Sequence, residues 1–174
     1  MSLPAAVQHA FERATRAAHA PLVWLHLGAD TLWLARDGGA SGAAFLSLDL
    51  GTDSTARLFF RSDLPRPQEL ERAIDHVEDE LMRAVAWSGE ITTLATEHPL
   101  VRGLAHNGAV LQRDSVEASF QRLASGALGD PSALKGLPTG REAAATLLIL
   151  RELMHHLGFS QVVVAPPSPA AALP

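Results

Sequence analysis

Residues 22–36 read LVWLHLGADTLWLAR, two apolar segments on either side of a short polar turn. Glycine at the first central position suits a type II′ turn, so the stretch predicts a β-hairpin around Gly28-Ala29. In this register Trp24 lies opposite Trp33, and the leucines gather on the other face of the hairpin. Both faces are therefore apolar, and both need a cover.

A second alternating stretch follows at residues 44–61, which read AFLSLDLGTDSTARLFFR. Apolar residues alternate with others in residues 44–50 and again in residues 55–61, the pattern of half-buried strands. A turn around residues 51–53 would join them into a second hairpin. The first third of the chain is thus predicted to form an antiparallel meander of about four strands.

Helical periodicity dominates the rest of the chain. Pro67 suits the first turn of a helix that runs to Val85 with apolar residues at i, i+4 and i+7. Shorter helices are expected at residues 4–18, 100–105 and 114–126. Residues 91–95 and 161–165 suggest short strands, the latter being the last strand of the domain. Thr139 and Glu142 form a capping-box signature for a helix that reaches Leu157 and is apolar nearly all round, typical of a buried helix.

These elements predict one α+β domain over residues 1–165, in which the meander packs against helices. Residues 166–174 are rich in proline and alanine and are expected to be a disordered tail. The length of 174 residues is ordinary for one domain.

Composition narrows the possible functions. The chain has no cysteine and no tyrosine, Lys135 is its only lysine, and its net charge is -5. Thiolate zinc sites, disulfides and tyrosine acid–base chemistry are excluded, and nucleic-acid binding is disfavoured because that affinity depends on basic residues. No signal peptide or membrane-spanning stretch is seen, so a soluble cytoplasmic protein is expected. Heavy use of arginine and alanine is typical of GC-rich coding sequences and suggests a bacterial-type protein.

Residues 48–52 offer one candidate binding site. The stretch Leu-Asp-Leu-Gly-Thr resembles the first phosphate-binding hairpin of the actin and sugar-kinase fold. On that resemblance Asp49 would face a metal ion, while Gly51 and Thr52 would form the phosphate turn. The alternative is a polar hairpin tip whose residues only make a turn.

Histidines and carboxylates supply the other candidates. His76 and Glu80 lie at i, i+4 on one helix and could share a metal ion, or could belong to a solvated face. Glu152 and His156 share a helix face beside His155, although histidines in a last helical turn are also favoured by the helix dipole. His98 and His106 lie in an irregular segment and could line a pocket.

Two functions remain open. The first is a binding or assembly module that self-associates, as a homodimer or higher oligomer, through the face that carries Trp24 and Trp33. The alternative is a small metal- or phosphate-dependent enzyme that uses a histidine–carboxylate site. The sequence favours the first, because no ligand set converges along the chain. It leaves the ligand and any cofactor open, and neither nucleic acid nor membrane is expected as a partner.

Overall fold

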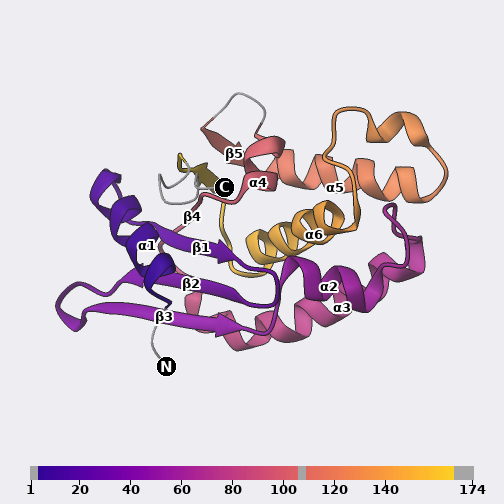
Figure 1. The fold of residues 1–174 in the computed structure, drawn as a ribbon. Coiled ribbons are helices and arrows are strands. Elements are labelled where there is room, and N and C mark those ends of the chain that lie inside the picture. The colour runs from indigo at the N-terminus through magenta and orange to yellow at the C-terminus, as the bar shows by residue number, and fades with distance from the viewer. Residues whose placement is uncertain (1–3, 106–108, 167–174) are drawn as a thin grey trace.

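The computed structural model describes residues 4–105 and 109–166, which form a mixed six-stranded sheet with helices on both faces (Figure 1). The strand order is β3-β2-β1-β4-β6-β5. The strands are β1 (Val23–Leu27), β2 (Leu32–Asp37), β3 (Ala43–Leu48), β4 (Thr93–Thr96), β5 (Val110–Gln112) and β6 (Gln161–Val164). No helix within these two ranges is long and apolar enough to cross a membrane.

The α-helices largely follow the predicted pattern. They are α1 (Ala5–Ala17), α2 (Thr52–Phe59), α3 (Pro67–Leu81), α4 (Pro99–Leu104), α5 (Arg113–Ala127) and α6 (Arg141–His156). Short 3-10 turns occupy Gly39–Ser41, Met82–Trp87 and Pro131–Leu134. The predicted capping box is absent: α6 begins after Gly140, whose φ of 100° favours glycine, and no side chain caps it. The predicted tail lies outside the described residues from position 167 onward.

The first hairpin has a longer turn than the sequence predicts. Trp24 pairs with Ala35 and His26 pairs with Trp33, so four residues, Gly28–Thr31, form the loop. The Gly28 amide donates to the Thr31 carbonyl at 3.0 Å. Because the register moves by two residues, every side chain keeps its predicted face. The predicted Trp24–Trp33 pair is therefore wrong, while the predicted leucine face is right.

The second hairpin is not present, which corrects the predicted four-stranded meander. The strand β3 is followed by the helix α2 instead of a returning strand. Alternation over residues 55–61 was compatible with a strand, but Thr52, Thr55 and Ala56 recur at helical spacing and are buried. The meander therefore has three antiparallel strands, and the chain returns through α2 and α3 to add β4 and β6 parallel to β1.

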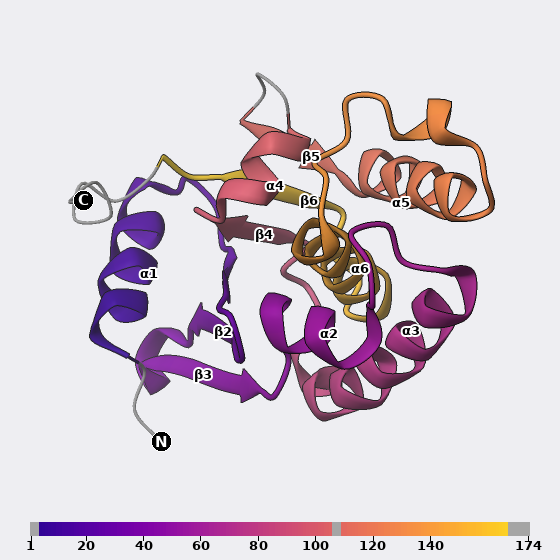
Figure 2. The ribbon, with the colours of Figure 1, turned by 45° about the vertical axis from the view of Figure 1, so that its right-hand side comes forward.

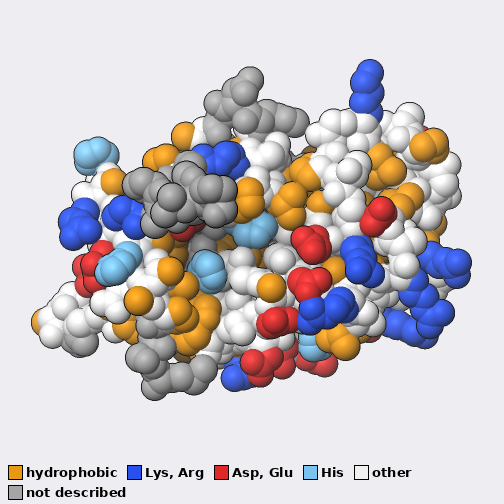
Figure 3. Space-filling model, in the orientation of Figure 1, with side chains coloured by type: hydrophobic (Ala, Val, Ile, Leu, Met, Phe, Trp, Pro, Cys, Tyr) orange, Lys and Arg blue, Asp and Glu red, His pale blue; other side chains and the backbone are white. Residues whose placement is uncertain are grey.

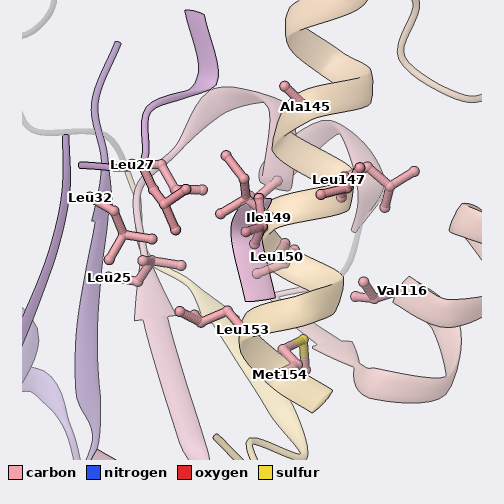
Figure 4. Packing of buried hydrophobic residues seen from close by; sticks show 14 of the residues in the cluster. Leu25, Leu27, Leu32, Val116, Ala145, Leu147, Ile149, Leu150, Leu153 and Met154 are labelled. Atoms are coloured by element: carbon pink, nitrogen blue, oxygen red, sulfur yellow. The ribbon is translucent and has the colours of Figure 1, made fainter. Parts of the chain in front are cut away.

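The buried helix α6 organises the larger core. It lies on one face of the sheet among α2, α3 and α5, while α1 covers the other face (Figure 2). Leu25, Leu27 and Leu32 of the sheet approach Ile149, Leu150 and Leu153 of α6, and Val116 of α5 lies on the helix's far side (Figure 4). The predicted central position of this helix is confirmed.

Candidate functional site

The parallel strands β1 and β4 end side by side, and polar side chains follow both. Ligands of sheets with parallel strands usually bind outside the carboxyl ends of the strands. His26 is the penultimate residue of β1, and its ring lies beside Gly28 at the start of the turn. Glu97 and His98 follow directly after β4. His26 lies near both Glu97 and His98. We name the place that these three side chains share the β1–β4 crevice, after the usual ligand position outside parallel strand ends, and take it as the candidate site.

Two hydrogen bonds of the His98 backbone fix the position of this residue. Its amide donates to the Thr96 hydroxyl at 3.2 Å, and its carbonyl accepts the Arg102 amide at 3.1 Å, which starts helix α4. Its side-chain Nδ1 is buried and has no hydrogen-bond partner within the described residues. A buried polar nitrogen is normally paired, so this unpaired atom marks an unusual place in the fold.

Both histidines of the crevice have a lowered pKa, which favours the neutral form of the ring. Burial, assisted by nearby His26, lowers the pKa of His98 to about 4. Burial also lowers the pKa of His26, although the charge of Glu97 acts in the opposite direction. At neutral pH each imidazole is therefore unprotonated and offers a free lone pair, and the low pKa makes His98 a weaker base than an ordinary histidine. Arg13 of α1 lies 3.3 Å from Glu97 and places a positive charge beside the crevice.

The predicted phosphate turn at residues 48–52 does not have the local structure that its resemblance to the actin and sugar-kinase fold implies. Residues after Gly51 enter a helix, so no strand–turn–strand exists there. The Thr52 amide donates to the Gly28 carbonyl at 3.0 Å, and the next two amides donate to the Ala29 carbonyl. A side chain at Gly51 would overlap that carbonyl. The first amides of α2 are thus occupied by the β1–β2 turn.

The remaining binding candidates are scattered. Asp49 is exposed and lies 3.8 Å from Arg83, so it does not reach the crevice histidines through any described contact. Thr52 is buried in the first turn of α2. His106 lies outside the described residues. Of the predicted binding residues, only His98 lies in the β1–β4 crevice, and the roles of Asp49, Thr52 and His106 stay predictions.

The two residues of the predicted metal pair, His76 and Glu80, have other contacts, and their role as metal ligands stays a prediction. The His76 ring packs against Phe59, with 5.2 Å between ring centroids, and Glu80 accepts a hydrogen bond from Arg83. The side chains that the fold does bring together lie nearby: Glu78 of α3 meets Glu152 and His156 of α6. The sequence indicates the Glu152–His156 pair, but the contribution of Glu78 depends on how α3 packs against α6.

The tryptophan face has a cover within the chain. Trp24 is 1% exposed and packs under α1, against Val7 and Phe11. Trp33 is half-buried beside the same cluster. Of the two covers that the sequence allows, the N-terminal helix is therefore present, and self-association through Trp24 and Trp33 stays a prediction.

Sequence reasoning missed His26 and Glu97 as site residues. His26 is the one polar residue within an otherwise apolar strand, and that is the signal that could have singled it out. Glu97 carries no comparable signal, because its proximity to His26 depends on the parallel pairing of β1 with β4.

The fold is a mixed-sheet domain that carries two histidines, His26 and His98, at the carboxyl ends of β1 and β4. No protein-family model and no curated protein sequence matches the chain. Solved structures do match. A Ppx/GppA phosphatase from Aquifex aeolicus matches 88% of this chain with a TM-score of 0.67 and 15% identity. An exopolyphosphatase-like protein matches 84% with a TM-score of 0.67 and 14% identity.

An exopolyphosphatase from Cytophaga hutchinsonii also matches, over 84% of this chain, with a TM-score of 0.60 and 12% identity. The chain spans only about half of these structures, between 53% and 56% of their lengths. At such low identity the likeness shows a shared fold.

Proposed function

We propose that this chain is a small phosphate-dependent enzyme whose active site is the β1–β4 crevice. The observation that carries the proposal is the pair of neutral, partly buried histidines, His26 and His98, at the carboxyl ends of two parallel strands. The shared fold with proteins named phosphatase and exopolyphosphatase supports phosphate as the ligand chemistry. This follows the histidine–carboxylate alternative and not the assembly module.

The crevice contains the groups that hydrolysis of a phosphate ester or anhydride needs. A neutral imidazole takes the proton of an attacking water, the oxygen of that water bonds to phosphorus, and the bond to the leaving group breaks. We assign the role of proton acceptor to the other ring nitrogen of His98, Nε2, because Nδ1 is shielded from solvent. Arg13 can contact phosphate oxygens, since guanidinium groups stabilise the charge of a transferring phosphoryl group.

Release of inorganic phosphate from p-nitrophenyl phosphate, ATP and polyphosphate tests the proposal. We expect His98→Asn to reduce kcat roughly 100-fold or more, the usual contribution of a positioned acid or base. His26→Asn should also reduce the rate. The matched control is His19→Asn, because His19 is exposed just after α1 and has no described contact with His26, Glu97 or His98.

Equal rates for the His98 variant and the control would contradict the assignment of the site. Absence of phosphate release by the wild type from all three substrates, together with no binding of pyrophosphate by calorimetry, would overturn the proposed function itself. Circular dichroism of each variant separates a lost function from a lost fold.

A further inference from the structure

A second cluster of ligand side chains lies where α3 crosses the end of α6, away from the β1–β4 crevice. Glu152 and His156 stand one helical turn apart on α6, and Glu78 faces them from α3. Most of the acidic side chains visible in Figure 3 lie over the helical half of the molecule, where α3 and α6 run. The ligand atoms of the three residues all lie within 4.8 Å of one another.

One histidine nitrogen serves two carboxylates in this cluster. His156 Nε2 lies 3.2 Å from Glu78 Oε1 and 3.4 Å from Glu152 Oε2. A single N–H can donate along only one of these directions, and the geometry favours Glu78. The Glu152 contact is close enough for charge attraction, yet Glu152 Oε2 has no hydrogen bond within the described part of the chain.

One carboxylate oxygen of Glu152 lacks a hydrogen-bond partner among the described residues. Glu152 is 1% exposed, and a buried carboxylate oxygen without a partner is costly. Arg151 donates to the other oxygen, Oε1, but the same guanidinium also binds Glu117 at 2.8 Å. Arg151 therefore contacts two carboxylates, Glu117 and Glu152, and no ion pair among the described residues links it to Glu78. A bound cation would supply positive charge to both Glu78 and Glu152.

The spacing of the ligand atoms also fits an ion. Ligands about 2.0–2.1 Å from a tetrahedral Zn²⁺ lie roughly 3.3–3.4 Å from one another. The two nitrogen–oxygen distances in the cluster, 3.2 and 3.4 Å, lie at that spacing. One imidazole and two carboxylates suit zinc or a similar transition metal better than Mg²⁺ or Ca²⁺, which prefer oxygen ligands alone.

We propose that Glu78, Glu152 and His156 bind one Zn²⁺ ion, which joins α3 to the C-terminal turn of α6. The side chains of Glu78 and His156 are 43% and 36% exposed, so the ion has access to solvent and a fourth position remains for water. The ion would take the place of the proton on His156 Nε2, with the imidazole proton then on Nδ1, and would satisfy the buried oxygen of Glu152. The proposal is independent of the phosphate chemistry in the crevice.

Calorimetry and thermal unfolding of the EDTA-treated full chain test the site with ZnCl₂ as the probe and MgCl₂ as the comparison. We expect one Zn²⁺ per chain. At free zinc of about 100 times Kd, the Tm should rise by roughly 5–10 °C, while magnesium should have no comparable effect.

Matched variants locate the site. His156→Gln and Glu78→Gln, both at partly exposed positions, should each abolish the zinc-dependent shift, whereas His155→Gln and His76→Gln should retain it. Loss of the shift in His76→Gln with retention in His156→Gln would overturn the assignment, as would zinc binding that none of the four variants changes. No zinc binding by the wild type would overturn the proposal as a whole.

Discussion

His98 shows how burial changes one side chain's chemistry. Its ring nitrogen is buried, His26 lies near it, and both effects lower its pKa to about 4. Glu97 and Arg13 are the charged neighbours of the crevice. An ordinary histidine would be partly protonated near neutrality, but this one stays neutral well below pH 7.

The lowered pKa of His98 predicts a pH dependence of stability. The unfolded chain binds a proton at this residue near pH 6.5 and the folded chain only near pH 4. The stability that the chain gains from keeping His98 unprotonated is therefore fully present above pH 6.5 and is lost as the pH falls toward 4. Urea unfolding at about pH 7 and about pH 5 should show a smaller stability loss in His98→Asn than in the wild type.

The control for this experiment is His19→Asn, which should keep the wild-type dependence on pH. Identical pH slopes in all three proteins would show that His98 titrates normally in the folded state. The neighbouring His26, whose pKa is also lowered, contributes in the same direction and remains in every variant.

At the scale of elements, α1 and α2 contact the antiparallel part of the sheet at two different places. The helix α2 begins against the β1–β2 turn, whose carbonyls accept its first amides. The helix α1 covers the opposite face, where Phe11 and Trp24 are buried together. Residues 55–61 have the alternation of a strand, but the chain forms the helix α2 there because Thr55 and Ala56 are buried on it.

Removing the Phe11 side chain tests the cover that α1 provides. Phe11 is 6% exposed, and Phe11→Ala should cost about 3–5 kcal/mol in the free energy of unfolding. The tryptophan fluorescence should shift to longer wavelength as water reaches Trp24. Light scattering should show more self-association than in the wild type, because an apolar face is uncovered. The exposed His9→Ala on the same helix is the control and should change none of these readouts.

At the scale of the whole molecule, α6 ties the sheet to the other helices. Its side chains from Ala143 to Leu150 are all buried, and they meet the sheet, α2, α3 and α5 in one cluster. The two candidate sites lie on either side of this core, one at the strand ends and one at the end of α6. Loss of packing on α6 should therefore affect the whole described fold.

Ile149→Ala tests this central role. Ile149 is fully buried, so the variant should lose about 2–5 kcal/mol in the free energy of unfolding. Tryptophan fluorescence, to which Trp24 and Trp33 of the sheet contribute, and far-UV circular dichroism should still lose their signals in one coincident transition. Leu128→Ala, at a side chain that is 77% exposed, should change stability by less than about 0.5 kcal/mol. Separate transitions in Ile149→Ala would mean that the sheet and the helices unfold independently.

The sequence by itself determined the local elements whose periodicity was strong. The leucine face of the first hairpin, the helix after Pro67 and the buried helix before Gly158 follow from the spacing of apolar residues. Periodicity reports only which face of an element is buried. It therefore gave the correct face of the hairpin with the wrong register, and it read α2 as a strand.

Only the tertiary structure decided which distant residues meet. Parallel pairing of β1 with β4 brings His26 near Glu97 and His98, and packing of α3 against α6 adds Glu78 to Glu152 and His156. Neither contact follows from spacing along the chain, because strand order and helix packing depend on burying all apolar faces at once. The residue types that the sequence offered for chemistry, histidine and carboxylate, are the ones that the fold brings together.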